Sequence, residues 1–317
     1  MPQIQLNDAS LLRNTAYVNG KWIPARTGKT FDVTDPATGQ VIATMPDMNA
    51  EDTDLAIQAA VAALPKFRRT TARSKAQLLY KWYQLLVEHA DDLAKLITAE
   101  NGKPLHEAKA EVLYAAQYLE WFSGEATRFD GETIHASEEG NRIYTIREPI
   151  GVVGLITPWN WPIGMVTRKI GPAFAAGCTV VLKSPGETPL TAAAMAVLGE
   201  RAGVPPGVLN IVTALENTVD VGRALTESPI VKKVSFTGST RVGKILMKQS
   251  ADTLKKLSFE LGGNAPFIVF EDANLDEAVK GAVACKFRSS GQTCICANRI
   301  YVHRSIYGRS ANPRVLE

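Results

Sequence analysis

Apolar residues recur at three- and four-residue spacing through residues 72–98 and again through residues 105–122. That period places apolar side chains on one face of an α-helix. Asn101-Gly102 followed by Pro104 supplies a helix stop between the two stretches. The first 130 residues are therefore expected to be mostly helical after a short extended start at AYVNGKWIP. The pattern predicts one long helix or two abutting helices over the first stretch and another over the second, with core side chains Val112, Leu113, Ala116, Leu119 and, as a further candidate, Trp121.

From Ile150 the pattern changes to short apolar runs that alternate with helical segments. Such alternation is typical of parallel βαβ units. Four such units in order predict an α/β fold with a doubly wound open parallel sheet, in which ligands bind at the carboxyl ends of the strands. The expected helices begin near Pro162, Thr188, Asn217 and Ser239, and the expected strands are GVVGLIT, TVVLKS, LNIVT, KKVSFTG and, as a further extended segment, KLSFELGG.

After Glu260 the sequence begins a second α/β unit. A strand PFIVF, a helix from Asn274 to about Arg288, a cysteine-containing loop and a strand NRIYVH follow one another. Residues 304–317 then contain three arginines, a single acid and no periodicity.

Composition indicates a folded chain and argues against some classes of binding partner. The 317 residues are 45% hydrophobic and 21% charged, which is typical of a globular protein of one large or two ordinary domains. The net charge of +3, with only short basic clusters, favours neither nucleic acid nor an anionic membrane. Three prolines and three glycines interrupt the longest uncharged run, residues 149–167, so no membrane helix is expected. The first residues match no secretory or organellar signal, so a cytoplasmic protein is expected.

The four cysteines are too few and too unevenly spaced for a disulfide framework or a four-thiolate zinc site, so no metal is expected. Cys294 lies in the small polar segment Ser-Ser-Gly-Gln-Thr-Cys, where an exposed thiol is a candidate nucleophile if its surroundings favour the thiolate. Cys178 and Cys285 have the apolar neighbours of ordinary core residues. For Cys296, packing is favoured over a second redox-sensitive thiol, because a relaxed disulfide at a two-residue spacing is difficult.

Three further segments carry candidate chemistry at strand ends or turns. In PWNWP, two prolines fix the backbone around Asn160, whose amide could donate to a developing oxyanion; a rigid aromatic turn is the alternative. In VSFTGSTRVG, Gly238 lets the chain turn into a helix whose N-terminus could hold a pyrophosphate, although the G-x-G-x-x-G fingerprint is absent and a plain turn is the alternative. In FELGGNAP, Glu260 lies on a segment apolar enough to be buried, where a carboxylate is either ion-paired or a general base with a raised pKa.

A strand-end Asn, a phosphate-type helix turn, a Gly-flanked Glu and an exposed Cys in one α/β chain fit covalent chemistry at a carbonyl group. With these motifs, residues 15 to about 307 resemble the first three-fifths of the aldehyde dehydrogenase superfamily, and most resemble its succinate-semialdehyde dehydrogenases. FELGGNAP and GQTCICANR match the active-site signatures of that family. The resemblance implies that a thiolate attacks the aldehyde, hydride passes to a nicotinamide, and water hydrolyses the resulting thioester.

The resemblance assigns Cys294 as the nucleophile, Glu260 as the base for the deacylating water, and Asn160, with the backbone amide of Cys294, as the oxyanion donor. The presence of Glu260 argues against the coenzyme A-acylating branch. Many NAD-preferring relatives have a glutamate at the position of Gly186, and its charge would repel a 2′-phosphate. The implied cofactor is therefore NADP or NAD, since Glu187 next door leaves NAD open. The implied cofactor contacts are Thr157, Trp159, Lys183 at the adenosine ribose, Gly186, Gly238, Ser239 and Leu261.

Arg168 and Arg288 match positions that clamp the distal carboxylate of the substrate in succinate-semialdehyde dehydrogenases. Because bidentate geometry suits arginine, the expected partner is a small carboxylated aldehyde such as succinate semialdehyde. Ordinary surface or interface arginines are the alternative. Ala214 replaces the usual glycine after LNIVT, so the adenine slot is expected to differ in detail.

The resemblance also divides the chain. It implies an NAD(P)-binding domain at residues 1–129 and 148–260, part of an oligomerisation region at 130–147, the start of a catalytic domain at 261–303, and a divergent tail at 304–317. Members of the family form homo-oligomers, but this chain has only part of that region, so an assembled oligomer is not implied. An unpaired strand there would be an aggregation-prone edge. The alternative to an active enzyme is an inactive truncated fragment that retains only a nucleotide-binding domain.

Overall fold

The computed structural model describes residues 4–310. The described residues divide into two compact units, the first comprising residues 4–237 together with 241–259, and the second comprising residues 238–240 together with 260–310. None of the helices between residues 4 and 310 is long and apolar enough to cross a membrane. Residues 311–317 of the tail lie outside the described residues.

The N-terminal part of the chain contains more strand than the hydrophobic pattern predicts. After a 3-10 turn (Ala9–Leu11), the extended start is confirmed as an antiparallel hairpin of β1 (Ala16–Val18) and β2 (Lys21–Ile23). A second antiparallel pair, β3 (Thr30–Thr34) and β4 (Val41–Pro46), is not predicted. Only two of the five residues of β3 are buried, and so short an alternation gives a weak signal.

Four helices follow the hairpins. The sequence predicts one long helix or two abutting helices over residues 72–98, and the second alternative is confirmed by α2 and α3, which only His89 separates. Gly102 ends α3 with a φ of +78°, and a Cβ there would lie 2.8 Å from the ring of Pro36, so only glycine fits. The helices are α1 (Ala50–Arg68), α2 (Ala72–Glu88), α3 (Ala90–Asn101) and α4 (Leu105–Ala126).

The predicted core face of α4 is partly wrong. Val112, Ala116 and Leu119 are fully buried, as their i, i+4, i+7 spacing predicts. Leu113 and Trp121, however, are 40% and 65% exposed. Each residue advances the helix by about 100°, so these two side chains fall outside the buried stripe.

A seven-stranded sheet forms the centre of the chain, in the order β11-β10-β7-β8-β9-β1-β2. Strands β7 to β10 are parallel, and β1 joins β9 in antiparallel orientation, so the sheet is mixed rather than wholly parallel. All the predicted strands and helices of this region are present. They are β7 (Val152–Ile156), α5 (Gly164–Ala175), β8 (Thr179–Lys183), α6 (Pro189–Ala202), β9 (Leu209–Val212), α7 (Thr218–Glu227), β10 (Val231–Gly238), α8 (Thr240–Ser250), a 3-10 turn (Ala251–Thr253) and β11 (Lys256–Leu261).

The strand order contains a topological switch point. The chain passes from β7 through β8 to β9 in one direction and then returns to place β10 beside β7. Open α/β sheets bind ligands where the order reverses, at the carboxyl ends of the strands. The doubly wound α/β architecture is therefore confirmed, and ligand contacts are expected after β7, β8 and β10.

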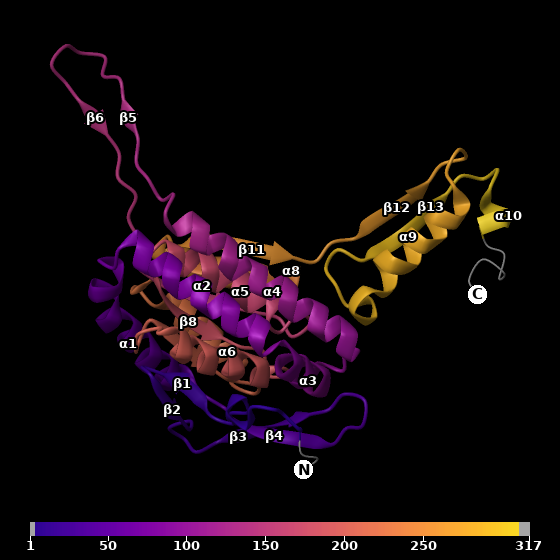
Figure 1. Cartoon of the computed structure of the whole chain (residues 1–317), viewed down its shortest axis with the longest axis horizontal. Helices are drawn as coiled ribbons and strands as arrows, with labels where there is room; N and C mark the ends of the chain where they lie inside the picture. The colour runs from indigo at the N-terminus through magenta and orange to yellow at the C-terminus, as the bar shows by residue number, and fades with distance from the viewer. Residues whose placement is uncertain (1–3, 311–317) are drawn as a thin grey trace. The chain divides into compact units, whose positions relative to one another are not determined.

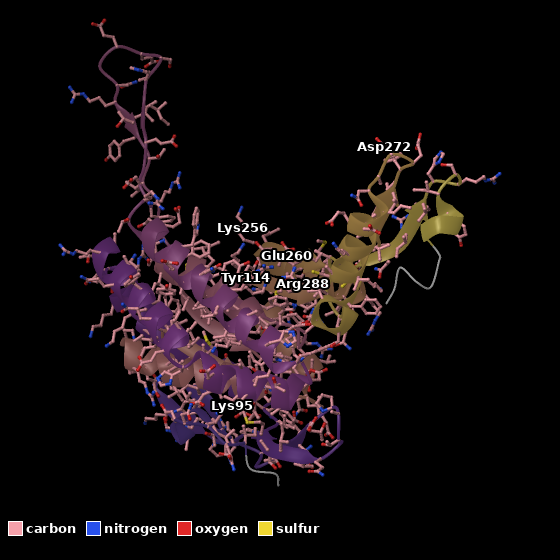
Figure 2. The ribbon with its side chains drawn as sticks, turned by 45° about the vertical axis from the view of Figure 1, so that its right-hand side comes forward. Lys95, Tyr114, Lys256, Glu260, Asp272 and Arg288 are labelled. Atoms are coloured by element: carbon pink, nitrogen blue, oxygen red, sulfur yellow. The ribbon has the colours of Figure 1, made fainter. Side chains whose placement is uncertain are left out.

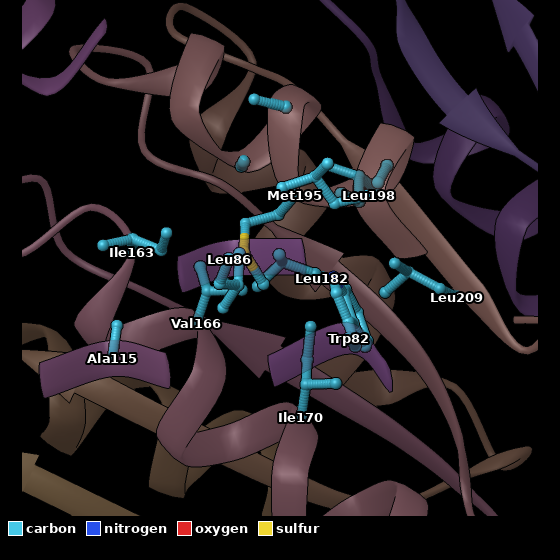
Figure 3. Packing of buried hydrophobic residues seen from close by; sticks show 14 of the residues in the cluster. Trp82, Leu86, Ala115, Ile163, Val166, Ile170, Leu182, Met195, Leu198 and Leu209 are labelled. Carbon is cyan, nitrogen blue, oxygen red and sulfur yellow. The ribbon is translucent and has the colours of Figure 1, made fainter. Parts of the chain in front are cut away.

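Helices cover both faces of this sheet (Figure 1). On one face, α5 packs on β8 and α6 packs on β9. The helices α2, α3 and α4 pack on the outer side of α5 and α6. The helix α1 packs on β8 and β9 and contacts α7. Because crossovers are right-handed, the reversal after β9 puts α7 on the face opposite α5 and α6. Figure 3 shows the core under α5 and α6, where the fully buried Trp82 of α2 lies near Ile170 and Leu182. This packing anchors the loops that follow β7 and β8.

Residues 130–147 contain a short antiparallel pair, β5 (Thr133–Ile134) and β6 (Ile143–Tyr144). Its apolar side chains are exposed, Tyr144 by 74% and Ile146 beyond it by 72%. This is the segment in which part of an oligomerisation region is predicted.

The second unit begins as the sequence predicts, with a strand, a helix and a parallel strand. Asn274 caps the helix by accepting a hydrogen bond from the amide of Glu277. Its elements are β12 (Ala265–Val269), α9 (Leu275–Phe287), the 3-10 segment η3 (Arg288–Gly291), β13 (Ala297–Val302) and α10 (Tyr307–Ser310).

Candidate active site

Three buried hydroxyls mark the carboxyl ends of the parallel strands. Thr157 directly follows β7, Ser184 directly follows β8, and Thr237 is the penultimate residue of β10. Within residues 4–310, the side-chain oxygens of all three are buried and have no hydrogen-bond partner. Leaving a buried polar atom unsatisfied costs about 1–3 kcal/mol. Such atoms are typical of places where a bound ligand supplies the missing hydrogen bonds.

Lys183, the last residue of β8, is a buried cation at the same edge of the sheet. Only 6% of it is exposed, and burial lowers its pKa to about 8, while the carboxylates of Glu187 and Asp47 oppose that shift. A lysine with this pKa is partly charged near neutral pH. It can therefore donate to a ligand or attract an anionic one.

Gly186 occupies a position where a side chain would be crowded by the loop after β9. A Cβ at this residue would lie 2.7 Å from Cδ1 of Leu215 and 3.0 Å from the carbonyl oxygen of Ala214. The loop after β8 therefore packs directly on the loop after β9. The neighbouring Glu187 is exposed, and its carboxylate favours the charged form of Lys183.

The loop between β7 and α5 carries Trp159 and Asn160. Asn101 donates from Nδ2 to the carbonyl oxygen of Trp159 at 3.0 Å. Lys103 donates from Nζ to the carbonyl oxygen of Asn160 at 3.1 Å. Thr188 also donates to the Trp159 carbonyl, at 3.5 Å, and so joins this loop to the loop after β8. The two prolines are therefore not the only groups that fix the backbone around Asn160.

Arg168 of α5 lies beside an aromatic cavity. Its guanidinium carbon is 5.1 Å from the ring centroid of Tyr118, and its Nη2 donates to the hydroxyls of Tyr118 and, at 3.4 Å, Tyr114. Both tyrosines come from α4, where Figure 2 labels Tyr114. A half-buried guanidinium with aromatic support is suited to a carboxylate ligand. A cavity of about 410 Å³ is lined by Tyr114, Gln117, Tyr118, Trp121 and Phe122.

Glu260 is exposed, so the expectation of a buried carboxylate is wrong. It lies near the end of β11 (Figure 2), which is the edge strand of the seven-stranded sheet. Residues of β11 alternate between exposed and half-buried, with Glu260 on the exposed side and Leu261 half-buried. An apolar segment indicates burial only for the side of the strand that another element covers, which explains the error.

Cys294 is exposed, as predicted, in the loop between η3 and β13. Ser289, Ser290 and Gly291 precede it with φ angles of +52°, +55° and +75°. Left-handed backbone costs a serine about 1 kcal/mol or more, and clusters of such residues are frequent at functional sites. This tight turn begins at Arg288, the predicted clamp residue, and leads to the accessible thiol.

The other three cysteines differ in how far they are buried. Cys178 is a buried core residue, as predicted, and burial raises the pKa of its thiol. Cys285 is only half-buried on α9, a helix with no buried residue, so its assignment to a core is wrong. Cys296 is 2% exposed, and its Sγ lies 2.6 Å from Oγ1 of Thr293. These contacts favour packing as its role.

The candidate residues divide between the two units, and their roles stay predictions. Gly238 ends β10 and Ser239 precedes α8. The first unit carries Thr157, Trp159, Asn160, Arg168, Lys183 and Gly186, and the second carries Gly238, Ser239, Glu260, Leu261, Arg288 and Cys294.

Sequence reasoning missed the side chains that hold the loop after β7. Asn101 and Lys103 fall within a segment whose sequence indicates only a helix stop. Glu111 interrupts the apolar stripe of α4, next to the buried Val112, and it is itself 1% exposed. A charged residue on an apolar stripe is the signal that could have revealed it, because a buried carboxylate must have partners.

Comparison with known proteins places these features in a family. The model described as the aldehyde dehydrogenase family matches residues 22–313. The chain is 56% identical over 292 residues to succinate-semialdehyde dehydrogenase [NADP(+)] 1 of Schizosaccharomyces pombe, and the aligned region covers 92% of this chain and 58% of that protein. It is 53% identical over 308 residues to succinate-semialdehyde dehydrogenase [NADP(+)] of Escherichia coli, with 97% and 64% covered.

The fold agrees with solved structures of similar sequence. The crystal structure of succinate-semialdehyde dehydrogenase from Burkholderia pseudomallei has a TM-score of 0.95 and 51% identity to this chain, covering 97% of this chain and 63% of that one. The chain thus spans about three-fifths of the length of the relatives that it matches.

Proposed function

Since the chain belongs to the aldehyde dehydrogenase family, we propose that it oxidises a carboxylated aldehyde to the acid through a thioester on Cys294. The observation that carries the proposal is the exposed Cys294 thiol, which follows a strained turn inside the matched region. The Sγ thiolate would bond to the carbonyl carbon, and the amides of Asn160 and of the Cys294 backbone would stabilise the oxyanion. Glu260 would then take a proton from the water that cleaves the thioester and releases the acid.

A nicotinamide cofactor fits the edge of the sheet that would hold it. When bound, it supplies the acceptor for the hydride that leaves the aldehyde carbon. The unsatisfied hydroxyls of Thr157, Ser184 and Thr237 and the buried Lys183 are groups that such a ligand can satisfy. We assign cofactor contacts to Thr157, Trp159, Lys183, Gly186, Gly238, Ser239 and Leu261.

NADP is supported as the cofactor, with NAD as the alternative. Gly186 provides no carboxylate that would repel a 2′-phosphate, and a Cβ at this position would be crowded by Leu215 and by the carbonyl oxygen of Ala214. The relatives from S. pombe and E. coli carry NADP(+) in their names.

Affinity for NADP should fall as the pH rises from 7 to 9. The pKa of Lys183 is about 8, so its ammonium is largely charged at the lower pH and largely neutral at the higher. We expect the Kd, measured by quenching of tryptophan fluorescence, to rise about tenfold over this range. Lys183→Arg should remove most of this dependence by keeping the charge. If Lys183→Met loses affinity with pH in parallel with the parent chain, another group is responsible.

The proposed substrate is an aldehyde with a distal carboxylate, such as succinate semialdehyde, which Arg168 and Arg288 would bind. Each is to be replaced singly by leucine. Because a charge-assisted hydrogen bond contributes about 1.5–3 kcal/mol, the KM for succinate semialdehyde should rise at least about tenfold. The KM for butanal, which has no carboxylate, serves as the control and should change little. An equal rise for both aldehydes would contradict the carboxylate clamp.

An inactive fragment that keeps only a nucleotide-binding domain is the competing proposal. It is favoured by the exposure of Glu260 and by the share of its relatives that the chain spans. The purified chain, mixed with NADP and succinate semialdehyde, distinguishes the two. Continuous formation of reduced nicotinamide supports the enzyme, whereas saturable binding of NADP without turnover supports the fragment.

A further inference from the structure

A buried ion pair lies beneath the loop that carries Asn160. Lys103 follows the glycine that ends α3, and Glu111 lies on α4. The two side chains are 2% and 0% exposed, and Nζ of Lys103 donates directly to Oε2 of Glu111. Neither residue belongs to a motif that the proposed function uses.

The pair holds the loop from both ends. Nζ of Lys103 donates to the carbonyl oxygen of Asn160 at 3.1 Å and lies 4.6 Å from the ring centroid of Trp161. Oε1 of Glu111 accepts from the amides of Ile163 and Gly164, at 3.1 and 3.2 Å, where α5 begins. One ion pair thus fixes the peptide that follows Asn160 and the first turn of the helix after it.

Stability alone does not account for this arrangement. Desolvating two charges is costly, and replacing a buried ion pair by apolar residues of similar volume is often neutral or stabilising. A buried pair whose remaining hydrogen bonds all reach one loop is better explained by the geometry that it imposes on that loop.

Glu100 provides an internal comparison. It is only 3% exposed, and it accepts from the amides of Leu190 and Thr191, at 2.7 and 2.9 Å, where α6 begins. Among the residues from 4 to 310, no lysine or arginine lies within ion-pair distance of it. Burial raises the pKa of Glu100 to about 8, so this carboxyl is largely protonated near neutral pH and caps α6 without a cation. At the start of α5 the capping carboxyl is paired with Lys103, which also contacts Asn160.

We infer that Lys103 and Glu111 are positioning residues for Asn160, which set the direction in which its side-chain amide faces the developing oxyanion. The inference rests on the proposed function, because it gives Asn160 its role. Neither residue touches the reacting atoms. They act by fixing the backbone from Asn160 to Gly164, on which the direction of the amide depends.

The test uses the double variant Lys103→Met/Glu111→Gln in the full chain. It leaves no unpaired buried charge, so it keeps the fold better than either single change, and the new amide oxygen can still accept from the start of α5. Hydrogen exchange of the amides in residues 159–164 should become roughly tenfold faster or more, while the start of α6 stays protected. Glu100→Gln is the matched control, because it makes the same change at the start of α6, and it should leave exchange in residues 159–164 as in the parent chain. Unchanged exchange in residues 159–164 would overturn the inference.

Kinetics test the catalytic part of the inference. The double variant should lower kcat about 10- to 100-fold, within what loss of an oxyanion donor costs, with little change in the KM for the aldehyde. Glu100→Gln should leave kcat near that of the parent chain. A loosened loop with unchanged kcat would overturn the positioning role. If the parent chain itself does not turn over, the proposed function fails, and hydrogen exchange alone still decides whether the pair holds the loop.

Discussion

Replacement of Cys294 by alanine should abolish aldehyde oxidation while NADP still binds with the affinity of the parent chain. The thiol supplies the bond that holds the substrate during hydride transfer, so its loss removes the covalent route rather than weakening it. Removing a catalytic nucleophile lowers kcat by roughly a thousandfold or more. Because the nucleotide contacts are assigned to other residues, cofactor affinity separates loss of chemistry from loss of folding.

The measurement is the rate at which reduced nicotinamide forms from succinate semialdehyde and NADP. Cys285→Ala is the matched control, since that thiol is also accessible in part and lies in the same unit. It should retain the activity of the parent chain. Turnover by Cys294→Ala at a rate near that of Cys285→Ala would show that Cys294 is not the nucleophile.

Alkylation provides a second test of the assignment of Cys294 as the nucleophile. Cys294 is exposed, whereas Cys178 and Cys296 are buried, so iodoacetamide should modify Cys294 before those two. Peptide mapping of the modified chain identifies the site. If activity disappears while Cys294 is still unmodified, the assignment is wrong.

Replacement of Glu260 by glutamine should divide the reaction into a normal first half and a slow second half. The glutamine cannot take a proton from water, so the thioester accumulates after hydride transfer. We expect a burst of reduced nicotinamide close to one equivalent per active chain. The steady-state rate that follows should fall about 10²- to 10⁴-fold, which is the usual contribution of a general base.

Stopped-flow measurement of the burst and of the later steady state checks this expectation. Asp272→Asn is a matched control, because Asp272 is another exposed carboxylate of the second unit (Figure 2). It should leave both phases as in the parent chain. Loss of the burst itself in Glu260→Gln would contradict a role confined to deacylation, and an unchanged steady state would exclude Glu260 as the base.

The parts of the fold that the sequence predicts are those with a strong local signal. The strands β7 to β10 consist of short apolar runs between helices. Because helices cover both faces of their sheet, the side chains on both sides of β7, β8 and β9 are buried, as a continuous apolar run predicts. The stop at Gly102 is equally local, because a left-handed residue is needed there.

The errors arise where burial depends on distant parts of the chain. Leu113 and Glu260 lie in segments whose average character is apolar, but each side chain faces the uncovered side of its element. Periodicity identifies a face, and only the packing of other elements decides whether that face is covered.

The support of the candidate site was the least predictable part. Lys103 and Glu111 are far from Asn160 in sequence, and they support the loop through hydrogen bonds to backbone groups that only the fold brings near them. A pattern of residue types records none of these contacts. The motif PWNWP indicates where chemistry is expected but not which side chains hold it there.

The close packing at Gly186 bears on how the choice of cofactor can be redesigned or can evolve. A carboxylate at this position would discriminate against a 2′-phosphate, but even its Cβ would collide with Leu215. The Leu215 side chain is 42% exposed and can turn away, but the carbonyl oxygen of Ala214 and Cβ of Leu215, both 3.0 Å from the added Cβ, would remain in place. A switch from NADP to NAD therefore requires the loop after β9 to shift, and a substitution at position 186 alone does not supply that shift.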